Sequence, residues 1–167
     1  MASPDAPTLV VLGLGNLLMG DDGLGVRAVE RLAAAFAPDA TTHFLDGGTL
    51  GLALLPYIER ADALLVVDAV ATGARPGTLV RLEADDVPRR VDVRLSPHEL
   101  GVVDILAGAT FSGRRPEPTI LLGVVPADIS FGVELSSAVE RSLPALIDTI
   151  VAEAHALGHR FTPIPPP

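Results

Sequence analysis

The chain has 167 residues, a net charge of −9 and no cysteine. This charge argues against a nucleic-acid partner, because nucleic-acid phosphates require clustered cations. The lack of cysteine excludes thiol nucleophiles, disulfides and thiolate zinc sites. All 12 basic residues are arginine, which also excludes a Schiff-base lysine and a P-loop lysine. The serine-hydrolase motif G-x-S-x-G is also absent, so we expect any chemistry to come from aspartate, glutamate and histidine.

The composition indicates one domain. A hydrophobic content of 49% is enough for a sizeable core, and no linker-like change in composition divides the chain. We expect a single domain over residues 1–160 and a proline-rich disordered tail over residues 161–167. No apolar run approaches the roughly 18 residues of a membrane span, and residues 1–7 lack the pattern of a signal peptide. These features predict a cytoplasmic protein without membrane insertion.

Apolar, β-branched segments alternate with helical patterns along the chain. The predicted strands cover residues 8–14, 41–45, 63–69, 78–82 and 119–125. The predicted helices cover residues 24–36, 50–60, 98–109 and 135–156. This alternation predicts an α/β fold, in which a mostly parallel sheet has helices on both faces.

The fourth strand is expected to run antiparallel to the others. The connection before it, from Ala69 to Thr78, is too short for a helical crossover and contains Gly73 and Gly77. The following segment, residues 84–96, must then return the chain across the sheet. Its alternating part, residues 91–95, could add a short extra strand.

A glycine-rich loop with two adjacent carboxylates joins the first strand to the first helix. A dinucleotide-binding fingerprint would need a glycine where Leu18 stands, and a helix N-terminus free to meet a pyrophosphate. Asp21 and Asp22 occupy that N-terminus and would repel the anion, so no nucleotide is expected. Either aspartate could instead be a simple helix cap, but one cap does not need two acids.

Three acids and one histidine are expected to converge at one edge of the sheet. Asp22 follows the first strand, Asp46 ends the second, Asp68 lies near the end of the third, and His98 opens the third helix. Ligand sites in such folds form outside the carboxyl ends of the parallel strands. An acid that ends a buried strand, such as Asp68, is costly unless it is paired or coordinated.

Two of these residues could have purely structural roles. Asp46 could be only a turn residue, and His98 could be only a helix-start residue. Two carboxylates and one imidazole nonetheless make a site for a divalent metal such as Zn, Ni or Fe, with coordination positions left open. The remaining histidines are interpreted as structural or solvated; they are His43, His155 and His159.

Five motifs follow one another in a characteristic order. They are Gly13-Leu-Gly-Asn16-Leu-Leu-Met-Gly-Asp21-Asp22-Gly-Leu-Gly25, Leu45-Asp46-Gly47-Gly48-Thr49, Val67-Asp68-Ala69, Ser96-Pro-His98-Glu-Leu-Gly101 and Leu122-Gly-Val-Val-Pro126. In this order and spacing the sequence resembles the [NiFe] hydrogenase maturation endopeptidases. The resemblance covers residues 8–157. Members of this family remove a C-terminal extension from the hydrogenase large subunit after nickel has been inserted.

The resemblance implies a three-layer α/β/α sandwich on a five-stranded mixed sheet. It places Asp22, Asp68 and His98 at the three metal-contacting, catalytic positions. It places Asp46 and the Gly47-Gly48-Thr49 turn on a loop that recognises the substrate. The implied partner is the precursor of a [NiFe] hydrogenase large subunit. The implied nickel belongs to this substrate, so no permanently bound metal is expected in the protease.

The resemblance leaves the chemistry of cleavage open. The nickel could polarise the scissile carbonyl or activate a water while a site carboxylate accepts a proton. Alternatively, the nickel could only position the tail. A different class of function is a non-catalytic checkpoint that binds the nickel-loaded large subunit without cutting it.

Overall fold

A five-stranded sheet forms the centre of the computed structural model, which describes residues 7–91 and 101–165. The strands follow the order β3-β1-β4-β6-β5 across the sheet. Their bounds are Leu9–Leu14 for β1, Thr42–Gly48 for β3, Ala63–Ala69 for β4, Leu79–Glu83 for β5 and Thr119–Val124 for β6. Four strands are parallel and β5 pairs antiparallel with β6, which confirms the expected sheet.

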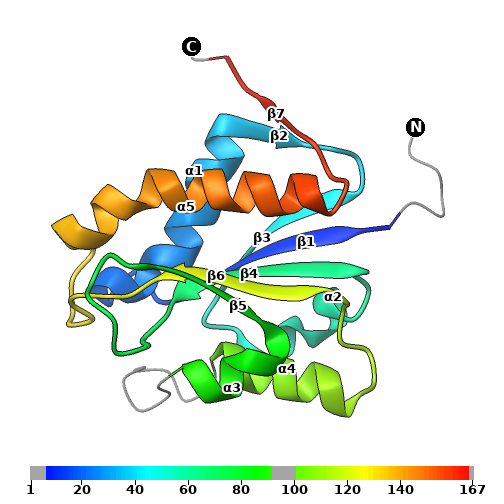
Figure 1. Cartoon of the computed structure of the whole chain (residues 1–167), viewed down its shortest axis with the longest axis horizontal. Coiled ribbons are helices and arrows are strands. Elements are labelled where there is room, and N and C mark those ends of the chain that lie inside the picture. Colours follow the sequence, from blue (N-terminus) through cyan, green and yellow to red (C-terminus); the bar gives the residue numbers. More distant parts are fainter. Residues whose placement is uncertain (1–6, 92–100, 166–167) are drawn as a thin grey trace.

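Helices cover both faces of this sheet and complete a three-layer α/β/α sandwich (Figure 1). One face carries α1 (Leu24–Ala35) and α5 (Ser137–Ala156). The other carries α2 (Leu55–Ile58), α3 (Val87–Arg90) and α4 (Val102–Phe111). Short 3-10 turns precede three of these helices; they are η1 (Gly20–Gly23), η2 (Gly51–Leu54) and η3 (Ala84–Asp86).

The central strands are hydrophobic on both faces because each face lies under helices. All six residues of β1 and all six of β6 are buried. Alternate residues of β1 therefore enter separate cores: Leu9 and Val11 pack under α1 and α5, whereas Val10 and Leu12 pack under α2 and α4. Continuous apolar strands of this kind are typical of parallel sheets.

The observed helices differ from the predicted ones in two places. The helix predicted over residues 50–60 is divided into η2 and the four-residue α2, with Pro56 at the start of the helical turn. The short helix α3 was not predicted, and it lies in the segment that returns the chain across the sheet. The possible extra strand over residues 91–95 lies outside the described residues except for Val91.

The prediction of a disordered tail from residue 161 is wrong for its first residues. Phe161–Pro163 forms β7, which pairs antiparallel with β2 (Phe36–Pro38), and the N–H of Ile164 donates to the carbonyl of Ala35. The physical reason is local packing, since the Phe161 ring contacts Phe44 edge-to-face at a centroid distance of 5.0 Å. Proline content alone did not reveal this contact.

A buried polar cluster fixes the approach to β7. The carboxylate of Asp39 accepts hydrogen bonds from the Arg160 N–H at 2.8 Å and the Thr42 hydroxyl at 2.9 Å. Burial would raise the pKa of Asp39, but these bonds hold it well below its usual range. His159 Nδ1 lies 3.0 Å from the Thr42 hydroxyl oxygen, so His159 is structural, as expected.

None of the helices in the described part of the chain combines the length and hydropathy that a membrane-crossing segment requires.

Candidate functional site

Glycines bring the start of α1 unusually close to the carboxyl ends of β1 and β4. A Cβ atom on Gly25 would lie 2.1 Å from the carbonyl oxygen of Val67, and one on Gly13 would lie 2.4 Å from the carbonyl oxygen of Gly25. At Gly15, φ is +129°, a conformation that favours glycine. The glycine-rich loop therefore serves close backbone packing and places η1 against the end of β4.

Asp22 is buried within η1, at 4% exposure. Its Oδ2 accepts a hydrogen bond of 2.8 Å from the backbone N–H of Asn16. This bond ties the carboxylate to the loop that follows β1. The position agrees with the expectation that Asp22 lies at the carboxyl edge of the sheet.

Asp68 lies at the carboxyl end of β4 and is half-buried. Burial and the negative charge of Asp22 raise its pKa to about 8, against the hydrogen bond that the Ala69 N–H donates to Oδ1. Since η1, which carries Asp22, contacts β4, the charge of Asp22 acts on the Asp68 carboxylate. The structure thus brings together two of the three residues expected to contact metal.

Asp21 has a different role from its neighbour. Its carboxylate is fully buried, and its Oδ2 accepts hydrogen bonds from the N–H groups of Ala127 at 2.8 Å and Asp128 at 3.0 Å. Its Oδ1 accepts a third bond, of 2.6 Å, from the N–H of Ser136. No side chain caps η1. Asp21 is therefore neither a helix cap nor a free ligand, and it fastens the connection between β6 and α5 to the loop after β1.

Asp46 is exposed on β3, in register with Gly13 of β1. Its Oδ1 accepts a hydrogen bond of 3.0 Å from the N–H of Gly48, where φ is +46°. The turn role that the sequence allowed is thus present. Gly47 is buried against Leu12 and Leu54 side chains, whereas Thr49 is exposed after the turn. Recognition of a substrate by residues Asp46-Gly47-Gly48-Thr49 remains a prediction.

His98 lies outside the described residues. Helix α4 begins at Val102, four positions later in the sequence, and the Asp104 carboxylate accepts a hydrogen bond from the N–H of Gly101 at 3.2 Å. Over residues 7–91 and 101–165, no group of three His, Cys, Asp or Glu side chains could hold a metal ion. A metal site formed by Asp22, Asp68 and His98 together therefore stays a prediction.

An apolar surface that the sequence analysis missed lies on the loop before η1 and on the segment hydrogen-bonded to that loop. It consists of Leu18, Phe131 and Val133, whose exposed fractions are 52%, 81% and 58%. Their backbones adjoin, because the Gly132 N–H donates to the carbonyl of Leu18 and Met19 forms a bridge with Gly132. The sequence could have indicated this surface, because Phe131 and Val133 are apolar residues in a segment outside every predicted strand and helix. We call these three residues the apolar rim.

The chain is similar to known hydrogenase maturation proteins. Residues 26–153 match the model of the family described as "Hydrogenase maturation protease". The hydrogenase expression/formation protein HupD of Rhodobacter capsulatus is 42% identical over 156 residues, which cover 92% of this chain and 74% of that protein. The hydrogenase 2 maturation protease of Escherichia coli is 33% identical over 156 residues, with 93% and 95% covered.

A solved structure supports the same relationship. The hydrogenase maturating endopeptidase HybD from Escherichia coli superposes with a TM-score of 0.86 and 32% identity, covering 93% of this chain and 97% of that one. Because the family match spans more than half of the chain and these relatives align over nearly all of it, the chain belongs to the hydrogenase maturation protease family.

Proposed function

We propose that this protein removes the C-terminal extension of a [NiFe] hydrogenase large-subunit precursor once nickel has been inserted. In this proposal Asp22, Asp68 and His98 contact the nickel that the precursor carries. The nickel is thus part of the substrate, and the protease reads its presence before it cuts. Membership of the maturation protease family supports the peptidase activity.

The observation that carries the nickel-reading proposal is the pairing of Asp22 with Asp68. Both carboxylates lie at the carboxyl edge of the sheet, and the charge of Asp22 contributes to the raised pKa of Asp68. Burial and the charge of Asp22 favour the protonated form of Asp68. A cation between the two carboxylates would remove their repulsion and allow Asp68 to ionise as a ligand. A nickel ion presented by a docked precursor would do so.

The proposed ligand set suits a metal that belongs to another protein. Two carboxylate oxygens and one imidazole nitrogen leave coordination positions open for the partner's own ligands. The full sequence contains no cysteine, so soft thiolate ligands must come from the precursor. A set of three such ligands should hold a free divalent ion weakly, so nickel would be recognised only in the complex.

The apolar rim supports a folded protein as substrate. Leu18, Phe131 and Val133 present apolar side chains on backbone segments that hydrogen bonds hold in place. Exposed apolar groups beside a site are typical of protein-binding surfaces. Two exposed acids, Asp128 and Glu134, border the rim. A precursor surface that combines apolar and basic side chains would complement it.

Two mechanisms fit the proposal. The nickel could polarise the scissile carbonyl, so that water adds to the carbon while a site carboxylate takes the water's proton; the C–N bond then breaks and the proton passes to the leaving nitrogen. In the second mechanism the nickel only positions the peptide near the carboxylates. Both mechanisms require the carboxylates of Asp22 and Asp68 beside the peptide bond that is cut.

The test compares precursor prepared with and without nickel, incubated with metal-stripped protease and weighed by mass spectrometry. We expect the extension to be lost only from the nickel-loaded form. Asp68→Ala and His98→Ala should abolish this loss, whereas the matched control Asp148→Ala, on an exposed position of α5, should retain it. Efficient cutting of nickel-free precursor would refute the proposal. Stable binding of the loaded precursor by the wild type without loss of the extension would instead indicate a non-catalytic checkpoint.

A further inference from the structure

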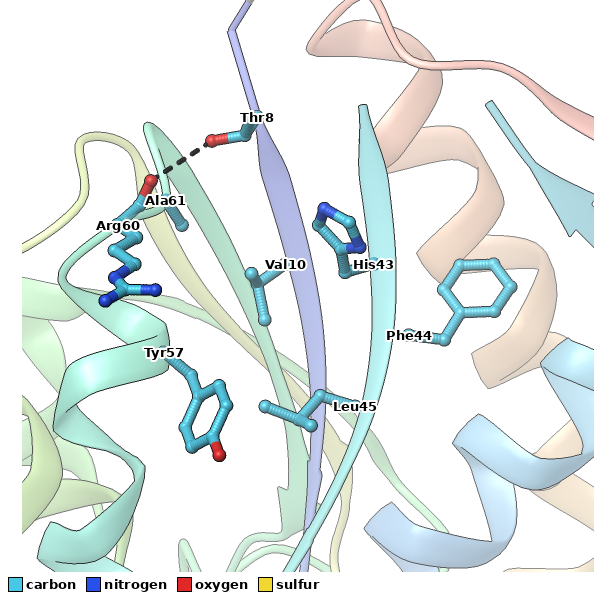
Figure 2. A pocket seen from close by; sticks show the side chains of 8 residues that line it. All are labelled: Thr8, Val10, His43, Phe44, Leu45, Tyr57, Arg60 and Ala61. Atoms are coloured by element: carbon cyan, nitrogen blue, oxygen red, sulfur yellow. Dashed lines mark hydrogen bonds between the residues drawn. The ribbon is translucent and has the colours of Figure 1, made fainter. Parts of the chain in front are cut away.

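A groove of about 450 Å³ lies between the edge strand β3 and helix α2, and neither carboxylate of the pair lines it. Figure 2 shows Val10, His43 and Leu45 on the sheet side of this groove, with Tyr57 and Arg60 opposite them; Phe44 points to the other face of the sheet. Tyr57 is 61% exposed, although it lines the same groove as the buried Val10. Side chains on this groove are thus available to a partner.

The outer edge of β3 is available for backbone pairing. β3 is the last strand of the sheet, and within the described ranges it pairs only with β1. Its outer N–H and C=O groups can therefore bind an extended peptide as an additional strand. Alternate side chains of such a peptide would point into the groove, because side chains alternate between the two faces of a sheet.

The charge of the groove is opposite to that of the whole chain. None of its lining residues is acidic, although the chain has 21 acidic and 12 basic residues. The guanidinium of Arg60 forms no ion pair with a carboxylate of the described residues. The acids nearest to it in sequence have other partners: Glu59 accepts from the Ser112 hydroxyl at 2.6 Å, and Asp62 from the Thr8 N–H at 2.7 Å. Arg60 can therefore bind a carboxylate that a peptide brings.

The groove is continuous with the candidate site. Leu45 lines the groove and directly precedes Asp46 on β3. Asp46 is in register with Gly13 of β1, and Gly13 is in register with Val67 of β4. Val67 directly precedes Asp68. Two strand spacings separate β3 from β4, and Leu45 is in register with Val66, two residues before Asp68, so this end of the groove lies about 12 Å from Asp68. The groove then follows β3 back to the level of Thr8, whose hydroxyl donates to the Arg60 carbonyl.

We infer that this groove binds the C-terminal extension of the precursor as an extended strand antiparallel to β3, with an acidic group of the extension at Arg60. The inference rests on the proposed function, and it describes how the protease binds the part of the precursor that follows the scissile bond. From the carboxylate pair to Arg60 the path is about 20 Å, which an extended chain covers with about six residues. An extension of about three residues cannot reach Arg60.

The first test measures binding of a synthetic peptide with the sequence of the extension to the protease alone, by fluorescence anisotropy. Arg60→Glu should raise the Kd at least about five-fold, because it replaces an attraction by a repulsion. Tyr57→Ala should also raise it. The matched control is Arg141→Glu, a charge reversal at an exposed position of α5 on the opposite face, and it should leave the Kd unchanged. Equal Kd values for the two charge reversals would overturn the inference.

The second test uses processing of nickel-loaded precursor. Arg60→Glu should raise KM for precursor with its full extension, with little change in kcat. It should have no effect on precursor whose extension is shortened to about three residues, because that extension ends before the groove. An equal loss on both precursors would place Arg60 outside the extension's path and overturn the inference. Since peptide binding is measured without cleavage, failure of the proposed function would not alter the first result.

Discussion

The buried carboxylate of Asp21 accepts a hydrogen bond of 2.6 Å from the backbone N–H of Ser136, 115 positions later in the chain. Ser136 caps α5, since its hydroxyl accepts from the N–H of Val139. One aspartate beside the candidate site therefore sets where the last helix begins. The same carboxylate also accepts hydrogen bonds from the N–H groups of Ala127 and Asp128, so its bonds flank the segment that carries Phe131 and Val133.

Asp21→Asn should lower the free energy of unfolding by about 2–4 kcal/mol, because an amide nitrogen would face backbone N–H donors in a buried site. Urea denaturation measures this loss. Asp148→Asn, an exposed substitution on α5, should change stability by less than about 0.5 kcal/mol. If both variants unfold at the same urea concentration as the wild type, the three hydrogen bonds do not anchor the segment.

The raised pKa of Asp68 predicts a stability that depends on pH. The folded pKa of about 8 lies above the ordinary value of 3.8, so the protonated carboxyl favours the folded state. This contribution is fully present below 3.8 and is lost as the pH rises through about 8. The side chain of Asp68→Asn cannot ionise, so this variant does not lose stability in that range. At alkaline pH it should be more stable than the wild type by at least about 1 kcal/mol.

Urea denaturation of both proteins in the presence of a chelator measures that difference. The gap between Asp68→Asn and wild type should be small near pH 4 and widen up to about pH 8. A constant gap over this range would show that Asp68 is ionised in the folded protein at neutral pH.

The approach of α1 to the sheet gives a second structural prediction. Gly25→Ala would place a Cβ 2.1 Å from the Val67 carbonyl oxygen, so α1 and the preceding η1 must move. We expect a loss of about 3 kcal/mol in the free energy of unfolding, together with slower precursor processing because Asp22 moves away from Asp68.

Gly132→Ala is the control, because the nearest atom to its new Cβ would be the Ser130 carbonyl oxygen at 4.0 Å. It should unfold like the wild type. Wild-type stability and processing in Gly25→Ala would mean that the close contact between α1 and β4 is not required.

The fold was predictable from the sequence because its strands are apolar, β-branched runs separated by clear helical patterns. The antiparallel direction of β5 followed from one short connection with Gly73 and Gly77, and the structure confirms it. The convergence of Asp22 and Asp68 at one edge followed from the rule that parallel strands end on the same side.

The remaining features depend on contacts between distant residues. Asp21 and Asp22 are adjacent in sequence, yet one accepts N–H groups from residues 127–136 and the other accepts from Asn16. No local pattern separates these roles. The pairing of β7 with β2 likewise depends on Phe161 meeting Phe44, which composition alone cannot show.

The last prediction concerns Asp46, for which a turn role and a substrate role make different demands on the side chain. Asp46→Asn keeps an oxygen that can accept from the Gly48 N–H, whereas Asp46→Ala removes it. If the carboxylate contacts the precursor, as proposed, both variants should raise KM about ten-fold, since each loses the charge. Nickel dependence should persist in both, because Asp46 is not a proposed ligand. KM values from processing of nickel-loaded precursor measure the effect. Normal processing by Asp46→Asn beside impaired processing by Asp46→Ala would assign Asp46 to the turn alone.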